Sequence, residues 1–242
     1  MRYRREDRLK LKAAAASSPD IALTQRNDAT GPIFFWREDE KPYGFLCQWY
    51  PSDFKDPEAH QSHVFNCAEQ CMMYRKALVL ATTNDDNYAA GKAPNPSKTN
   101  KTSMGSSRAG KLGFTAEQLP AAILAAQKPG EQKSLARSVQ FTDSQLKIWE
   151  SIKFEVVTHG SYMKYAQNAE LMARLLATGD RELVEASPTD RVWGIGFAAA
   201  VAMDVHRDAW GSNLLGKALM SVRERLRAEQ DLDASDADAD LP

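Results

Sequence analysis

Two charged residues, Glu69 and Lys76, have the types and the spacing that an active site uses. If the chain around them is helical, a separation of seven residues puts both side chains on one face, about two turns apart. Met72, Met73 and Leu80 are expected on the same face. The acid and the amine would then lose water, which is costly unless they are paired or used by the site. A carboxyl group and an amine in such surroundings suit acid–base and nucleophilic chemistry.

A solvated helix face that happens to include two methionines is the ordinary alternative, because charged residues are usually exposed. The spacing of seven residues does not suit an ion pair on a helix surface, which needs three or four. One ligand lying along the helix would instead reach both Glu69 and Lys76. The residues alone leave the choice between a solvated face and a ligand site open.

Four nearby residues, His60, His63, Cys67 and Cys71, are of the types that bind zinc. On a helix Cys67 and Cys71 lie one turn apart, but their stripe also carries a tyrosine and a leucine. Such a stripe is typical of a core, where a free cysteine packs as a small apolar residue. We therefore expect a structural role for the cysteines, with no metal and no cofactor.

Two glycine-rich loops each combine a tryptophan with a polar side chain. They contain Asp190, Trp193, Gly194 and Gly196 in the first loop, and Trp210, Gly211, Ser212 and Asn213 in the second. A tryptophan in a loop can stack on a base or ribose, and glycine amides can bind a diphosphate. The second loop leads into a helix with Ser212 or Asn213 as N-cap, so free amides there would suit an anion. Turn glycines beside a core tryptophan are the common alternative.

Composition limits the kind of partner and compartment. The formal net charge of -1 argues against binding to a nucleic-acid backbone by charge alone, although a nucleotide-sized ligand is possible. The three clustered cysteines and the lack of a secretory signal indicate a reducing compartment, cytoplasmic or nuclear, rather than secretion. No apolar run approaches the roughly 18 residues of a membrane helix. We expect a soluble monomer with no membrane partner.

The first half of the chain contains the expected strands. Residues 33–36 and 45–50 are aromatic-rich and bounded by glycine or proline, and residues 62–65 form a third candidate. The helix that carries Glu69 follows, as far as residue 80. Residues 81–111 have no apolar period and indicate a long loop insertion.

The second half is expected to be mostly helical, because its apolar residues recur at helical spacing. The expected helices are 116–127, 143–157, 162–177, a short piece at 181–185, and 214–229. His159, beside Gly160, is expected at a helix end, and Arg223 is expected to face water. The fold class is therefore α+β, a mostly helical single domain over residues 31–229 with a small β-sheet. A flexible arm (1–30) and an acidic disordered tail (230–242) are expected to flank it.

Taken in order, these motifs resemble the NADAR family, also called YbiA-like proteins, whose name refers to NAD and ADP-ribose. The matching segments are residues 43–52, 69–76, 136–139, 164–168, 175–179, 183–187, 190–196 and 210–223, together with Trp149. The likeness spans residues 33 to 226 and implies a YbiA-like fold. Gln70 stands where the family usually has histidine, a departure that bears on substrate preference.

The resemblance implies an N-glycosidase, a hydrolase that cleaves the bond between ribose C1 and a nitrogen. It implies two substrate classes: ADP-ribose on guanine bases in nucleic acid or nucleotides, and phosphoribosyl pyrimidine intermediates of riboflavin synthesis. A non-catalytic module that binds ADP-ribose is the third alternative, and the presence of both Glu69 and Lys76 favours an enzyme. We expect removal of ADP-ribose from a single-stranded or flipped guanine, which fits the near-neutral charge.

The resemblance also implies roles for individual residues. Glu69 is expected to be the general acid–base and Lys76 the amine that forms a Schiff base, or alternatively a group that binds phosphate. The implied nucleotide-binding residues are Arg137, Asn168, Asp190, Trp193, Gly194, Gly196, Trp210 and Asn213. Among them, Arg137 is expected on a phosphate and Trp193 is expected to stack.

Overall fold

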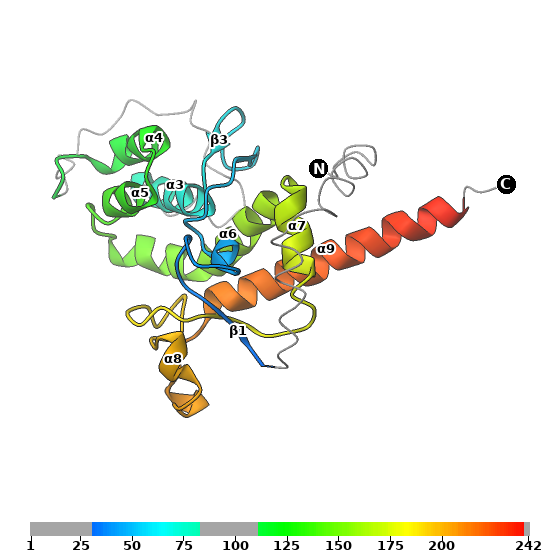
Figure 1. Cartoon of the computed structure of the whole chain (residues 1–242). Coiled ribbons are helices and arrows are strands. Elements are labelled where there is room, and N and C mark those ends of the chain that lie inside the picture. The colour runs from blue at the N-terminus through cyan, green and yellow to red at the C-terminus, as the bar shows by residue number, and fades with distance from the viewer. Residues whose placement is uncertain (1–30, 83–110, 240–242) are drawn as a thin grey trace. The chain divides into compact units, whose positions relative to one another are not determined.

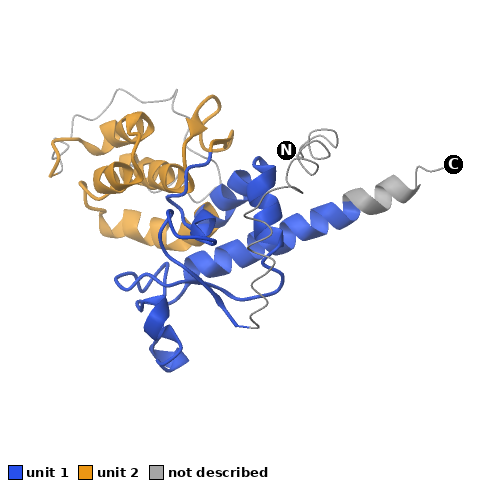
Figure 2. Ribbon diagram, in the orientation of Figure 1, with its two compact units in different colours: residues 1–52, 157–242 blue, residues 53–156 orange. Residues whose placement is uncertain are grey.

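The structure, a computed structural model, describes residues 31–82 and 111–239 (Figure 1). The expected N-terminal arm and nearly all of the expected insertion lie outside these residues. The chain divides into two compact units, unit 1 with residues 1–52 and 157–242 and unit 2 with residues 53–156 (Figure 2). Helices predominate in the described residues and each unit has a two-stranded sheet, which confirms the α+β class.

Helix α3 (Ala68–Ala81) is the centre of unit 2. It is buried on almost every side, and its neighbours η3, α4 and α5 all pack against it. The other elements of unit 2 are β2 (Phe54–Lys55), β3 (Val64–Phe65), η3 (Ala116–Gln118), α4 (Leu119–Ala125), α5 (Pro129–Ala136) and the first part of α6 (Asp143–Ala166). β2 and β3 pair antiparallel just before α3 begins. The helix predicted to carry Glu69 and Lys76 is confirmed.

Unit 1 is built on a parallel pair of strands far apart in sequence. β1 (Ile33–Phe35) pairs with β4 (Leu183–Glu185), with Ile33 opposite Leu183. The other elements are η1 (Gly44–Leu46), the end of α6, α7 (Ala169–Leu176), α8 (Ala199–Ala202), η4 (Arg207–Ala209) and α9 (Leu214–Ala239). α9 packs against both β4 and α7. The described helices of the two units are too short or too polar to cross a membrane.

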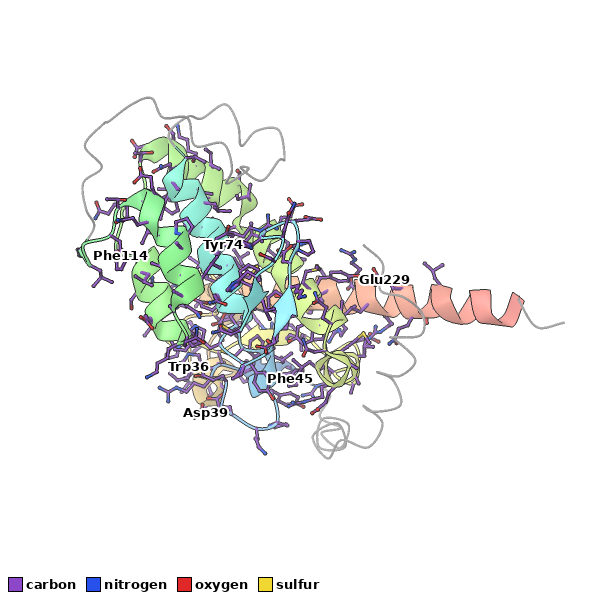
Figure 3. All side chains as sticks on the ribbon, turned by 90° about the horizontal axis from the view of Figure 1, so that it is seen from above. Trp36, Asp39, Phe45, Tyr74, Phe114 and Glu229 are labelled. Atoms are coloured by element: carbon purple, nitrogen blue, oxygen red, sulfur yellow. The ribbon has the colours of Figure 1, made fainter. Side chains whose placement is uncertain are left out.

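The predicted strand at 45–50 is wrong, because its carbonyl groups are used by side chains of α6. The segment begins with the short turn η1 and contains no strand. The buried Lys164 Nζ donates to the carbonyls of Phe45 and Cys47, at 2.8 and 3.1 Å. The Tyr165 hydroxyl donates to the Phe45 carbonyl at 3.1 Å. Phe45, labelled in Figure 3, is fully buried and meets the Tyr165 ring edge-on.

Several helices differ from the sequence prediction. α6 continues through His159 and Gly160, so the predicted helix end there is wrong; a glycine costs a helix only about 1 kcal/mol. Residues 181–185 contain β4 instead of a helix, because this segment pairs with β1. Helix α5 was not predicted, although Pro129 at its first position is a helix-start signal.

The C-terminal helix α9 departs from expectation at its end and on one face. It continues to Ala239, so the residues predicted as a disordered tail from 230 are helical for most of their length. Arg223 is buried, not exposed as predicted. Its guanidinium donates to Thr178 Oγ1 at 2.7 Å and to the Arg181 carbonyl at 2.9 Å. Arg223 therefore ties α9 to the chain that follows α7.

Gly216→Ala should destabilise the protein, even though alanine favours helices over glycine. A Cβ at Gly216 would lie 2.0 Å from the Leu183 carbonyl oxygen and 2.6 Å from the Asn213 amide group. We expect a loss of about 2 kcal/mol or more in the free energy of unfolding, measured by chemical denaturation. Gly31→Ala is the control, because its Cβ would meet nothing within 4 Å. Equal stability of both variants would contradict the packing of α9 on β4.

Candidate active site

Glu69 and Lys76 lie on α3 and neither is on a solvated face. The exposed fraction of Glu69 is 4%, and Lys76 is half-buried. Met72 and Met73, expected beside them, are also buried. The alternative of an ordinary solvated face is therefore wrong.

The surroundings of Lys76 favour its neutral amine. Burial lowers the pKa of Lys76 below its ordinary value, and the positive charge of Arg137 adds to this effect. Lys133 lowers the pKa further, whereas the negative charge of Glu69 opposes the shift. A lysine becomes a nucleophile when desolvation and neighbouring cations reduce its protonation. Lys76 has both features.

Arg137 lies at the end of α5 and is exposed. The positive charge of Arg137 acts on the Lys76 amine, as does that of Lys133 in α5. The structure thus brings three predicted residues, Glu69, Lys76 and Arg137, into one region of unit 2. A guanidinium together with the Lys133 ammonium group suits a phosphate or diphosphate, since arginine can bind such groups through two parallel hydrogen bonds.

Two buried glutamines attach the chain before α5 to the start of α3. Gln70 Nε2 donates to the carbonyls of Ile123, Leu124 and Ala126. Gln132 Nε2 donates to Ala126 and to the Asn66 side chain. The resemblance relates Gln70 to substrate preference; in the structure its side chain makes this connection. Neither glutamine has a sequence motif that would have revealed its role.

The residues considered for zinc are used in other ways. Burial raises the pKa of the Cys71 thiol well above its ordinary value, and the Asp56 carboxylate adds to this shift. The Cys67 thiol contacts Gln132 Oε1 at 3.4 Å, and His60 Nδ1 accepts from the backbone N–H of His63 at 3.1 Å. Within residues 31–82 and 111–239, no three His, Cys, Asp or Glu side chains gather as a metal site.

The first glycine-rich loop, in unit 1, is organised by Asp190. Its Oδ1 accepts from the backbone N–H groups of Val192 and Trp193, both at 2.8 Å. Trp193 is half-buried, and Gly194 is buried where a Cβ would lie 2.6 Å from the Glu185 carbonyl oxygen. Gly196 has φ 77, a conformation that favours glycine. These contacts shape the loop itself.

The prediction of free amides at the start of α9 is wrong. The backbone N–H groups of five successive residues donate to carbonyls of the first loop. Gly211 donates to Ile195, Ser212 to Arg191, Asn213 to Gly194, Leu214 to Val192 and Leu215 to Trp193. The loops approach so closely because Gly211 has no side chain: its Cβ would lie 2.4 Å from the Arg191 carbonyl oxygen. The donors expected for an anion thus join the two loops.

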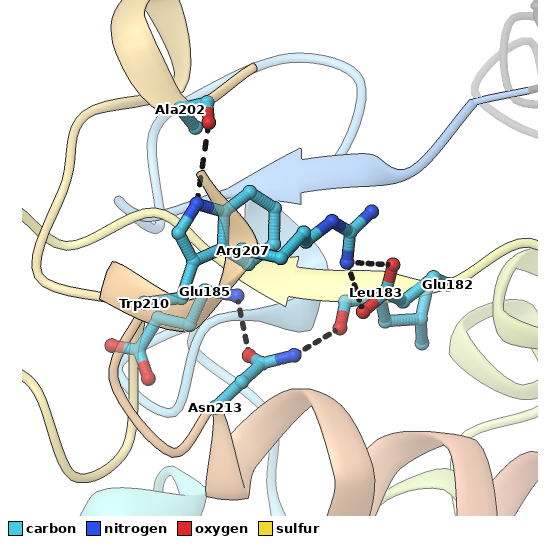
Figure 4. A network of polar contacts seen from close by, with 7 residues as sticks. All are labelled: Glu182, Leu183, Glu185, Ala202, Arg207, Trp210 and Asn213. Atoms are coloured by element: carbon cyan, nitrogen blue, oxygen red, sulfur yellow. Dashed lines mark hydrogen bonds and ion pairs between the residues drawn. The ribbon is translucent and has the colours of Figure 1, made fainter. Parts of the chain in front are cut away.

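Asn213 and Trp210 of the second loop are also occupied by the protein (Figure 4). The Asn213 side chain accepts from the Glu185 N–H at 3.0 Å and donates to the Leu183 carbonyl at 2.9 Å. Its amide thus bonds to the backbone of β4 as a neighbouring strand would. The Trp210 indole N–H donates to the Ala202 carbonyl at 3.2 Å. The Arg207 guanidinium lies 4.1 Å from the Trp210 ring.

Asn168 caps the junction between α6 and α7. Its Nδ2 donates to the Lys164 carbonyl at 2.7 Å, and its own carbonyl accepts from Met172 at 2.8 Å. The predicted site residues are thus divided: Glu69, Lys76 and Arg137 in unit 2, the others in unit 1. The contacts of the second group described above are internal to unit 1 and shape its loops.

Comparison with known proteins adds independent information. A family model described as the NADAR domain matches residues 34–109 and 106–227. N-glycosidase R617 of Acanthamoeba polyphaga mimivirus is 33% identical over 196 residues, which are 79% of this chain and 94% of that relative. Protein irg-1 of Caenorhabditis elegans is 31% identical over 192 residues, 78% and 74% of the two chains. The NMR structure of Escherichia coli YbiA shares the fold, with a TM-score of 0.53 at 21% identity, covering 83% of this chain and 87% of that one.

Proposed function

The chain belongs to the NADAR domain family, and we propose that it is an N-glycosidase that removes ADP-ribose from guanine bases. One observation carries this proposal: α3 holds both a buried carboxyl group, Glu69, and an amine of lowered pKa, Lys76. The name of R617, an N-glycosidase similar over most of both chains, supports the reaction class.

The proposed reaction needs an acid and a nucleophile. Glu69 gives a proton to the ribose ring oxygen; the ring opens and leaves a C1=N imine to the guanine nitrogen. The neutral amine of Lys76 adds to C1, and the guanine nitrogen leaves with a proton. Water then adds to C1 of the lysine imine, releasing Lys76 and an aldehyde that closes again to ADP-ribose. The addition to C1 needs a neutral Lys76, which the lowered pKa favours.

The cationic group beside Lys76 supports a phosphorylated substrate. In the proposal Arg137 and Lys133 bind the diphosphate of ADP-ribose, which orients C1 toward the amine. Binding of an anion offsets the charges of Arg137 and Lys133, but burial, the largest cause of the lowered pKa of Lys76, remains. Both candidate substrate classes carry phosphate, so this group by itself does not separate them.

Release of ADP-ribose from a single-stranded oligonucleotide with ADP-ribosylated guanine tests the function. We expect turnover by the wild type and a loss of roughly a hundredfold or more in Glu69→Gln, because a positioned acid contributes that much. Glu155→Gln is the matched control, since Glu155 is exposed on α6 of the same unit. Chromatography of free ADP-ribose gives the rate.

Parallel incubations decide between the alternatives. If the protein hydrolyses a phosphoribosyl pyrimidine intermediate but not the ADP-ribosylated guanine, the pyrimidine intermediate is its substrate and the same steps apply to it. Binding of ADP-ribose without release from either compound would make the protein a binding module and reject the enzyme. An unchanged rate in Glu69→Gln would reject this residue as the acid.

A further inference from the structure

The ring of Phe141, which precedes α6, lies next to the amine of Lys76. The Lys76 Nζ lies 5.3 Å from the centroid of the Phe141 ring. The Phe141 ring also stacks on Trp149, with 6.4 Å between centroids and 20° between planes. Trp149 is buried, with an exposed fraction of 6%. The half-buried Phe141 ring is thus supported by a fixed aromatic plate.

The start of α6 fixes Phe141 relative to α3. The Thr142 N–H donates to Gln145 Oε1 at 3.0 Å and the Gln145 N–H donates to Thr142 Oγ1 at 3.3 Å, a reciprocal capping arrangement. Gln145 Nε2 donates to the carbonyls of Leu80 and Thr82 at the end of α3. Leu80 is one helical turn beyond Lys76. These bonds hold Phe141 beside the amine.

We propose that Phe141, supported by Trp149, is a positioning residue that excludes water from Lys76 and so prepares its amine for attack on C1. This inference rests on the proposed function, in which Lys76 is the nucleophile. It assigns a role to the turn between α5 and α6: Arg137, at the end of α5, supplies charge beside the amine, and Phe141 supplies an apolar cover.

Two effects of an aromatic ring on an ammonium group oppose each other. The ring face attracts the cation, which favours the protonated form, by about 0.5–2 kcal/mol. Exclusion of water disfavours that form. Burial by all the surrounding groups is the largest cause of the lowered pKa of Lys76. We take exclusion of water as the larger effect of the Phe141 ring, and the labelling experiment below tests that choice.

The charged groups that act on the amine are Glu69 on α3, Lys133 on α5 and Arg137 after it. Of the other elements that pack against α3, α4 and β3 contain no ionisable residue, and Glu117 of η3 is exposed. Substitution of Phe141 leaves all of these charges in place. A change in the titration midpoint of Lys76 in such a variant is therefore caused by the loss of the Phe141 ring and not by a change in the surrounding charges.

Trace labelling of the full chain with acetic anhydride tests the cover directly. The neutral amine displaces acetate from the reagent, so the labelling rate of Lys76 at each pH, measured by peptide mass spectrometry, follows its deprotonation. We expect Phe141→Ala to move the midpoint to higher pH, and the relative labelling at pH 7 to fall severalfold. Phe141→Leu keeps an apolar cover and should retain the wild-type midpoint.

Phe154→Leu is the matched control, because Phe154 is exposed on α6, and the exposed Lys147 serves as a reference in every sample. Circular dichroism verifies that each variant is folded. A wild-type midpoint in folded Phe141→Ala would overturn the proposal. So would a midpoint moved to lower pH in Phe141→Leu, since the ring would then act mainly through its attraction for the cation.

Labelling needs no substrate, so it separates this inference from the proposed function. Failure to release ADP-ribose, together with the expected shift in Phe141→Ala, would reject the glycosidase and keep the cover of Lys76. Normal release without any shift would keep the glycosidase and reject the cover.

Discussion

Lys76→Arg is expected to lower the rate of ADP-ribose release by roughly a hundredfold or more. The change keeps a positive charge on the same face of α3 but replaces the amine with a guanidinium that stays protonated. Substrate affinity should change little, because Arg137 and Lys133 remain. Borohydride added during turnover should attach the sugar to Lys76 in the wild type, and mass spectrometry of the labelled peptide checks the position.

The same variant separates two roles of Lys76. If the amine only bound a phosphate, arginine would serve as well and Lys76→Arg would retain most of the activity. Lys147→Arg, on an exposed position of α6, is the control for the substitution itself. If active enzyme repeatedly gives no adduct at Lys76 with borohydride, the mechanism does not include a lysine imine.

Gln70→Leu should be strongly destabilising although it nearly preserves volume. The wild-type Nε2 group donates at 3.1 Å to Ile123, 3.3 Å to Leu124 and 3.1 Å to Ala126, and Oε1 accepts from the Asn66 N–H at 3.0 Å. The Ala126 carbonyl still accepts from Gln132 Nε2. The Ile123 and Leu124 carbonyls and the Asn66 N–H lose these bonds, at about 1–3 kcal/mol for each unsatisfied buried group. We expect a loss of about 3 kcal/mol in the free energy of unfolding, measured by denaturant titration.

Gln140→Leu, at an exposed position, provides the comparison and should change stability by less than about 0.5 kcal/mol. Because Gln70 holds the chain that leads into α5, its loss should also alter the trace labelling of Lys76, which lies near Arg137 and Lys133. Equal stability of Gln70→Leu and Gln140→Leu would show that the amide contributes no net free energy.

Local pattern was sufficient to predict the helix that carries Glu69 and Lys76. Helical spacing placed both residues on one face, and α3 has almost the predicted bounds. Pattern was insufficient for the segment 45–50, where aromatic residues bounded by prolines indicated a strand. Its carbonyls instead accept from Lys164 and Tyr165 of α6, more than a hundred residues later. Such acceptors have no local sequence signal.

The glycine-rich loops show the same limit. Their composition suits phosphate binding and close packing equally well, because a glycine permits both. Five amides at the start of α9 donate to the carbonyls of the first loop. Whether these amides bind a phosphate or the other loop depends on how closely two segments separated in sequence approach each other. Asn213 was likewise expected to bind the ligand, but its side-chain amide bonds to the backbone of β4.

The sequence by itself determined the family and the α+β class, because these depend on ordered motifs and on the spacing of apolar residues. It also placed Glu69 and Lys76, the proposed acid and amine, on one face of a helix. Only the tertiary structure decided that Glu69 is buried and that Lys76 has a lowered pKa. Both properties depend on exclusion of water and on charges brought near by α5 and the start of α6. Burial and long-range electrostatics arise from packing, and a single segment of sequence does not contain them.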